Sequence, residues 1–163
     1  MKKAILISAL LAGVAAIAFG YKAYTARVAA SAPTAAANTA AREDLQKFMQ
    51  TDIHHEYTFL SFTIWHDRPM TPEKMDTIAA SSSKVMRMAQ DLDKFESTYK
   101  NQGWSDDDLQ FFEDKRLQLS RVAEELNHAA QKHDSTAVVN FFMHMDSTCQ
   151  SCHKRFRPEL QWI

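Results

Sequence analysis

Apolar residues recur at helical spacing in four successive segments of the chain, with polar residues between them. An apolar side chain every three or four residues is typical of an amphipathic α-helix that buries one face. The first segment runs from Arg42 to about Trp65, and Asp67-Arg68-Pro69 interrupts it. It predicts a first helix whose buried stripe consists of Leu45, Phe48, Met49, Ile53, Tyr57, Leu60 and Ile64.

Capping residues set the limits of the next two helices. Thr71 suits the N-cap of the second helix, with Pro72 at its first helical position, and residues 101–103 end it. Ser105 is the expected N-cap of the third helix, and residues 106–108 place three aspartates in its first turn, where negative charge meets the positive end of the helix dipole. The two stripes are Met75, Ile78, Ala79, Val85, Met86, Ala89, Leu92 and Tyr99, and then Leu109, Phe112, Leu119, Val122, Leu126 and Ala130.

The fourth helix begins after a break at residues 133–135, with Asp134 or Ser135 as its N-cap, and Pro158 ends it. Its stripe contains both cysteines and consists of Val138, Phe141, Phe142, Met145, Cys149, Cys152 and Phe156. Only 3 Gly and 4 Pro occur in 163 residues, and no alternating Val/Ile-rich run indicates a strand. The pattern therefore predicts an all-α fold, an antiparallel four-helix bundle.

The first 41 residues do not share this pattern. A basic Met1-Lys2-Lys3 start precedes an uncharged apolar run from Ala4 to Gly20, at the border between a signal-peptide core and a short membrane span. We expect residues 1–21 to be a signal peptide or membrane anchor, 22–41 an Ala/Thr/Ser-rich linker and 42–163 the bundle. Both fates of the segment place the bundle in the periplasm, either soluble after cleavage or tethered to the inner membrane.

The charge is unevenly distributed. Of the 19 Lys and Arg residues, four lie in the first 41, which leaves 15 against all 20 acidic residues and a formal charge of −5 on the bundle. This balance argues against nucleic acid as a partner and suits a basic protein partner. The interaction would affect association rate rather than fold.

The only two cysteines lie in Cys149-Gln150-Ser151-Cys152-His153, near the end of the chain. The C-x-x-C-H pattern is the attachment motif of a c-type haem, in which each thiol forms a thioether and the following histidine is an axial ligand of the iron. Three other interpretations are weaker. A thioredoxin-like dithiol needs a βαβ setting, a structural zinc site needs a second ligand pair, and a disulfide across i, i+3 of a helix is awkward.

Two stretches carry a family resemblance. Gly103-Trp104-Ser105-Asp106, and the haem motif followed by Lys154-Arg155-Phe156-Arg157, resemble the third-helix start and the C-terminal ending of the cytochrome c′ family, the class II c-type cytochromes. The resemblance covers about residues 44–157. It implies one covalent haem c per chain bound by Cys149 and Cys152, with His153 as the proximal ligand and Arg157 near the exposed side of the haem.

The resemblance also directs attention to the sixth iron site, which the family fills from the first helix or leaves empty. Met49 lies on the first stripe, at the end that an antiparallel bundle brings beside the end of the fourth helix. Residues 44–49 also resemble the first-helix opening of the methionine-ligated bacterial cytochrome b with the same bundle. Met49 is therefore the expected sixth ligand, although a stripe methionine is ordinarily core packing. His54, rotated off the stripe, and His55, nearer solvent, are competitors that would give bis-His ligation.

The other histidines, His66, His128, His133 and His144, show no paired spacing for zinc and are expected at the surface. Met75, Met86 and Met88 are expected to be core packing.

Three functions follow as hypotheses. The first is an exported electron carrier with redox protein partners and no substrate turnover, because the sequence offers no catalytic acid–base pair or nucleophile. The alternative is a five-coordinate cytochrome c′ that binds nitric oxide or carbon monoxide. The third is a tethered dimerising or sensory module whose haem serves only to detect a bound ligand. A homodimer is also compatible with the first two hypotheses.

Overall fold

The computed structural model describes residues 42–101 and 103–157, which belong to the unit Asn38–Ile163. The predicted signal or anchor segment, the linker and Pro158 lie outside the described residues. Within the described part the chain forms helices and no strand. None of these helices is both long enough and apolar enough to cross a membrane.

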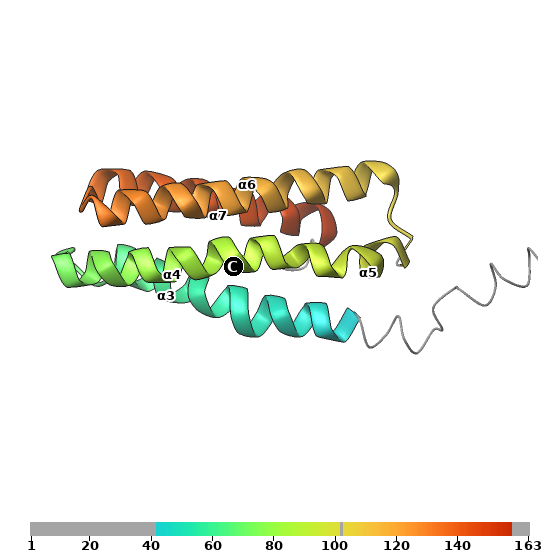
Figure 1. The fold of residues 1–163 in the computed structure, drawn as a ribbon, viewed down its shortest axis with the longest axis horizontal. Coiled ribbons are helices and arrows are strands. Elements are labelled where there is room, and N and C mark those ends of the chain that lie inside the picture. Colours follow the sequence, from blue (N-terminus) through green and yellow to red (C-terminus); the bar gives the residue numbers. More distant parts are fainter. Residues whose placement is uncertain (1–41, 102, 158–163) are drawn as a thin grey trace, which may run out of the picture. The chain divides into compact units, whose positions relative to one another are not determined.

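The described chain runs through four helical rods, and the all-α prediction is confirmed. The first rod continues from residues 42–47 through η1 (Phe48–Ile53) into α3 (His54–Trp65), and the second comprises α4 (Pro72–Asp91), η2 (Leu92–Phe95) and α5 (Glu96–Asn101). The third is α6 (Asp106–Gln131) and the fourth is α7 (Ser135–Phe156). In Figure 1 the α3–α4 and α6–α7 connections lie at one end and the α5–α6 connection lies at the other, so successive rods are antiparallel.

The predicted caps hold three helix starts. Thr71 Oγ1 accepts from the Lys74 N–H at 3.4 Å, with Pro72 at the first helical position, and Asp134 Oδ1 accepts from the Ala137 N–H at 3.0 Å. Ser105 forms a capping box with Asp108, in which each side chain bonds the other residue's backbone N–H. Each side-chain oxygen satisfies a backbone donor that the first turn cannot pair internally.

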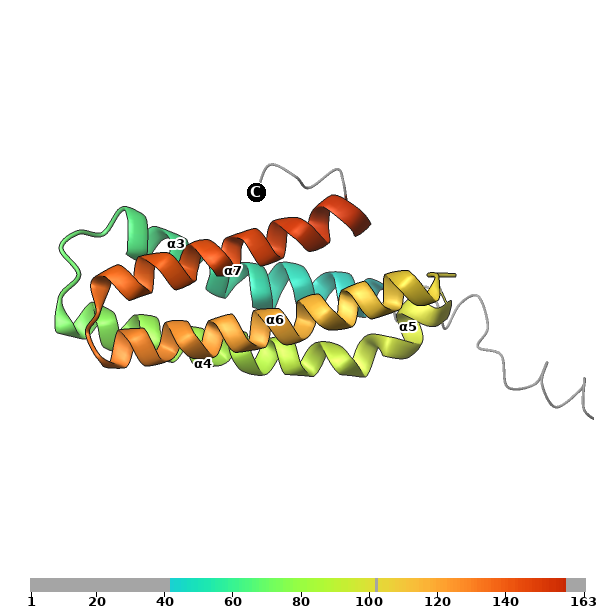
Figure 2. The ribbon, with the colours of Figure 1, turned by 90° about the horizontal axis from the view of Figure 1, so that it is seen from above.

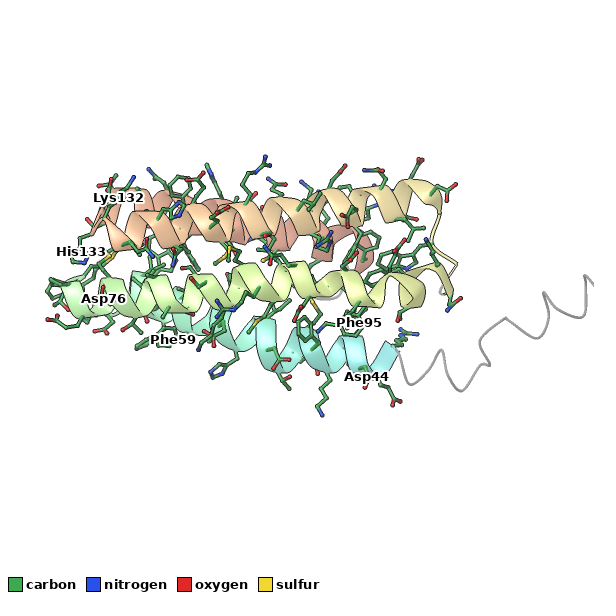
Figure 3. The ribbon with its side chains drawn as sticks, viewed as in Figure 1. Asp44, Phe59, Asp76, Phe95, Lys132 and His133 are labelled. Atoms are coloured by element: carbon green, nitrogen blue, oxygen red, sulfur yellow. The ribbon has the colours of Figure 1, made fainter. Side chains whose placement is uncertain are left out.

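Two irregular turns differ from the expected uninterrupted helices. η1 is a π-helical turn inside the first rod, and η2 is a 3₁₀ turn inside the second. Neither contains Gly or Pro, so no breaker residue marks them in the sequence. Phe95 of η2, labelled in Figure 3, lies beside Phe48 of η1 with ring centroids 5.5 Å apart, so the two irregular turns contact each other.

The packed core occupies the half of the bundle nearer the α3–α4 and α6–α7 connections. Its fully buried side chains include Leu60 and Ile64 of α3, Ile78 of α4, Leu126 of α6 and Val138 of α7. At that end His133, at φ 55°, turns the chain into α7, and its Nε2 lies 3.9 Å from Asp76 Oδ1 (Figure 3). Before Ile53, by contrast, the first rod has no fully buried residue. The core therefore leaves the opposite half of the bundle to the site described next.

Candidate haem site

Every residue predicted to hold the cofactor lines one cavity of about 440 Å³. Cys149, Cys152 and His153 reach it from the last turns of α7, Arg157 from the residue that ends α7, and Met49 from η1. A cavity of this volume lies in the range of sites for cofactors and drug-sized ligands. Figure 2 shows why the wall is shared, since the start of the first rod and the end of α7 lie at the same end of the bundle.

The π-helical turn changes which residues of the first rod share this wall. The His54 N–H donates to the Met49 carbonyl oxygen, five residues back, rather than to the residue four back. Met49 and His54 are therefore adjacent along the helix axis, and both line the cavity. His54 is exposed, in keeping with its expected position off the buried stripe, although it also borders the cavity at the π-helical turn. His55 is exposed and does not line the cavity.

An aromatic cluster closes one side of the cavity. Trp104 stacks on Phe156 with ring centroids 4.1 Å apart and on Tyr99 at 4.8 Å, while Tyr99 and Phe112 approach to 4.2 Å. All four side chains line the cavity. Three of them come from different parts of the chain, the end of the second rod, the α5–α6 connection and α6, and the fourth comes from the haem-motif helix. The resulting wall is apolar and fits a flat, apolar macrocycle.

A hydrogen-bonded pair joins the first rod to α7 at the cavity edge. Tyr57 donates to Asp146 Oδ1 at 2.6 Å, and Gln150 donates to Asp146 Oδ2 at 2.7 Å. Burial raises the pKa of Tyr57, and its hydrogen bond to Asp146 raises that pKa further. The phenol is thus a neutral donor at any physiological pH. The sequence shows Tyr57 only as a stripe residue, and nothing in it indicates the pairing with Asp146.

The two cysteines are free thiols rather than a disulfide. Burial raises the pKa of the Cys149 thiol to about 12 and that of Cys152 to about 11, the latter opposed by the charge of Lys115. Both are therefore protonated in the folded bundle at neutral pH. Among the described residues, no group of three or more His, Cys, Asp or Glu side chains gathers as a metal-ion site. Within the described residues, no further ligands gather beside the C-x-x-C-H motif to complete a structural zinc site.

An ion pair links the start of α6 to the end of α7. Arg155 Nε and one terminal nitrogen each lie 2.7 Å from Asp108 Oδ1, and the guanidinium carbon lies 4.6 Å from the centre of the Phe111 ring. Asp108 also accepts from the Ser105 hydroxyl at 2.7 Å. The capping box and the last turn of the motif helix thus share one carboxylate. The sequence predicts the cap but gives no signal for its link to Arg155.

The family model Cytochrome C' matches residues 90–157, which include the aromatic cluster's contributors from Tyr99 onward and the whole haem motif. Residues 90–157 are therefore similar to the cytochrome c′ family. No curated protein and no solved structure gives a significant match to the chain. A match to the cytochrome c′ family over the C-x-x-C-H motif implies a covalently bound c-type haem. The matched region excludes the first rod, so Met49 and His54 receive no support from it.

The cavity fits the haem of a cytochrome c′ in its polar groups as well as its walls. Haem is an apolar ring with two carboxylates, and four cationic side chains line the cavity against a single carboxylate, Asp146. The cations are Arg42, Lys115, Arg116 and Arg157. Tyr99 also lines the cavity, and its hydroxyl is buried and has no hydrogen-bond partner among the described residues. Such an atom is expected where a cofactor supplies the missing partner.

Proposed function

We propose that this protein is an electron-transfer cytochrome that works outside the cytoplasm, with His153 and Met49 as the axial ligands of its iron. The observation that supports this most strongly is the position of Met49. Its side chain lines the same cavity as His153 and both cysteines, but it comes from a different rod. Ligands on the two faces of a haem must come from opposite sides of the cavity, because one helix cannot reach both.

The residues of the cavity have distinct parts in this proposal. Cys149 and Cys152 form the two thioethers, and His153 and Met49 hold the iron from either side. Haem supplies one-electron oxidation and reduction when bound. The aromatic cluster excludes water from one side of the ring, and the packed half of the bundle fixes the helices that carry the ligands. A site held in this way changes little between oxidation states.

The proposal includes no substrate turnover. The bundle's formal charge of −5 suits a basic redox protein as partner, and it disfavours nucleic acid. The protein would act in the periplasm, as a soluble protein after cleavage or tethered by its N-terminal segment, and as a monomer or a homodimer. Its partner would have to reach the exposed side of the haem, near which the family resemblance puts Arg157, the residue that ends α7.

Replacing Met49 tests the ligand assignment. We expect the wild-type ferric protein to be low-spin, with the weak near-infrared sulfur-to-iron band of His/Met ligation. Met49→Leu should convert it to a mainly high-spin form that binds carbon monoxide, with a lower reduction potential, since a thioether ligand favours Fe(II). Met145→Leu is the matched control, because Met145 is buried in the core and does not line the cavity. Leu and Met are nearly equal in volume, so both variants should fold.

Two other results would replace this assignment. A wild-type protein that is already high-spin, with a spectrum unchanged in Met49→Leu, would make it the gas-binding member of the family. A low-spin spectrum that survives Met49→Leu and disappears in His54→Ala would make it a bis-His cytochrome. The second outcome has a structural basis, because His54 shares the cavity wall with Met49.

A further inference from the structure

The hydroxyl of Tyr99 stands out among the polar groups of the bundle. Tyr99 is 2% exposed, and its Oη is the one buried side-chain nitrogen or oxygen in the described residues that has no hydrogen-bond partner. Buried polar atoms in native proteins nearly always have a partner, because losing water without replacing its hydrogen bond is costly. A partner for this hydroxyl is therefore expected from something other than the protein.

The ring of Tyr99 has little freedom to move its hydroxyl elsewhere. Trp104 stacks on it with an interplanar angle of 14° and a centroid distance of 4.8 Å, and Phe112 contacts it at 4.2 Å. Both neighbours also line the haem cavity. The position of the hydroxyl is thus fixed by its surroundings, and the partner must come to it.

The two residues whose charges act on the Tyr99 hydroxyl both line the haem cavity. Burial raises the pKa of Tyr99, and the charges of Arg116 and Cys152 act on it in opposite directions. Cys152 is one of the two attachment residues, and Arg116 lines the same cavity. Arg116 is already bound by Glu113, and its terminal nitrogen lies 4.0 Å from Asp93. The charge and the hydrogen bonds of this guanidinium are therefore largely used within the second and third rods.

The polar chemistry of the cavity suits an anion. Arg116 is paired with Glu113, but Arg42, Lys115 and Arg157 also line the cavity, and its one lining carboxylate, Asp146, already accepts hydrogen bonds from Tyr57 and Gln150. A phenol in such a setting is a donor that needs an acceptor. The only hydrogen-bond acceptors that the periphery of a haem carries are its two propionate carboxylates.

We propose that the Tyr99 hydroxyl donates a hydrogen bond to a haem propionate and so fixes the orientation of that propionate within the cavity. This inference rests on the proposed haem-binding function and adds to it the residue that holds a carboxylate. It lies outside the C-x-x-C-H motif and on a different rod from either axial ligand. The bond would also hold the propionate in its ionised form, because a donor stabilises the charged state.

A water molecule is the competing partner. Tyr99 also borders a smaller cavity of about 220 Å³, on whose walls lie Leu92, Leu109 and Glu113. A cavity of that size can hold water when enough polar groups converge on it. Tyr99 lies between the two cavities, so the experiment has to distinguish a bond to haem from a bond to water.

The test compares Tyr99→Phe with Tyr57→Phe in the mature, haem-loaded protein. Each variant removes one cavity-lining hydroxyl and keeps the ring, but Tyr57 already has Asp146 as its acceptor. In resonance Raman spectra we expect Tyr99→Phe to shift the propionate bending mode to lower frequency and Tyr57→Phe to leave it unchanged. The pH range over which the reduction potential varies should move upward in Tyr99→Phe, corresponding to a roughly tenfold higher proton affinity of the propionate.

The outcomes separate this inference from the proposed function. A Tyr99→Phe protein with an unchanged propionate mode and unchanged pH dependence, but a lower unfolding midpoint, would assign the hydroxyl to water and overturn the inference. An unchanged or higher midpoint would show that the hydroxyl is unpaired and would overturn it as well. In both cases the haem stays covalently bound and its spin state is unaltered, so the proposed function stands. Wild-type protein without covalent haem would instead refute the proposed function.

Discussion

Glu56 shows how a single charged residue is kept inside the packed half of the bundle. Its side chain is 10% exposed, it accepts from Lys84 Nζ at 2.8 Å, and it also accepts from the Ser81 hydroxyl. Burial alone would raise the pKa of Glu56. The hydrogen bonds from Lys84 and Ser81 outweigh burial, so the pKa lies below its ordinary value of 4.5.

This lowered pKa predicts the direction of acid sensitivity. A carboxyl whose pKa is lower in the folded state stabilises the fold above its unfolded pKa, and that contribution is lost as pH falls through the folded pKa. The wild-type protein should therefore lose stability below about pH 4.5, and Glu56→Gln should lose less over the same range. At neutral pH the variant should be less stable by about 1 to 3 kcal/mol, because the Lys84 bond loses its charge assistance. Urea unfolding at several pH values measures both effects, and parallel pH curves for the two proteins would contradict the prediction.

At the same scale, burial was only partly predictable from the sequence. Leu60 and Ile64 were expected in the core and are fully buried. Glu56 lies three residues after Ile53 and four before Leu60, so its spacing places it on the same buried stripe. Its burial was not predicted, because a charged side chain is ordinarily exposed. Conversely, Phe62 is 60% exposed, because it faces outward on α3. A residue's chemistry gives its preference for the interior, and its position on the helix decides the outcome.

At the scale of whole elements, the residues at which helices begin were the easiest feature to predict from the sequence, and the irregular turns were the hardest. Thr71, Ser105 and Asp134 cap helices as expected, since a cap depends on one side chain and the backbone N–H groups next to it. The π turn at Phe48–Ile53 lies against the cavity and contacts η2, and both involve residues distant in sequence. Local sequence alone does not encode such a turn.

The π turn makes a direct prediction about Met49. Deleting Thr51, an exposed residue within η1, should remove the extra residue and restore α-helical winding. All residues before it would then rotate by about 100° and shift by about 1.5 Å relative to α3. Met49 would leave its present position on the cavity wall, so the protein should become mainly high-spin while its far-ultraviolet circular dichroism remains helical.

Thr51→Ala is the control for the deletion, because it removes the same side chain and keeps the residue count. It should retain the low-spin spectrum. A low-spin spectrum that persists in the deletion variant would mean that the turn does not position the sixth ligand.

At the scale of the whole bundle, the two halves have different structures. One half is a continuous core, and the other holds a cavity enclosed by the start of the first rod, the α5–α6 connection and the end of α7. The sequence predicted that Met49, Cys149, Cys152, His153 and Arg157 would converge, because an antiparallel four-helix topology brings the first and last segments to the same end. It gave His54 only as a competing ligand off the stripe, and Tyr99 only as a stripe residue of the second helix. His54 borders the cavity next to the π turn, and the Tyr99 hydroxyl is buried without a hydrogen-bond partner. Both features become visible only in the folded chain.

The claim on which all of this depends is that one haem is bound covalently through both cysteines. Intact-mass measurement of the mature protein, combined with thiol titration under denaturing conditions, tests it most directly. The expected result is a mass higher than that of the polypeptide by one haem, no titratable thiol, and haem that stays with the chain after acid-acetone extraction. Correctly exported protein that shows the polypeptide mass alone, with the Cys149 and Cys152 thiols both free, would contradict the account.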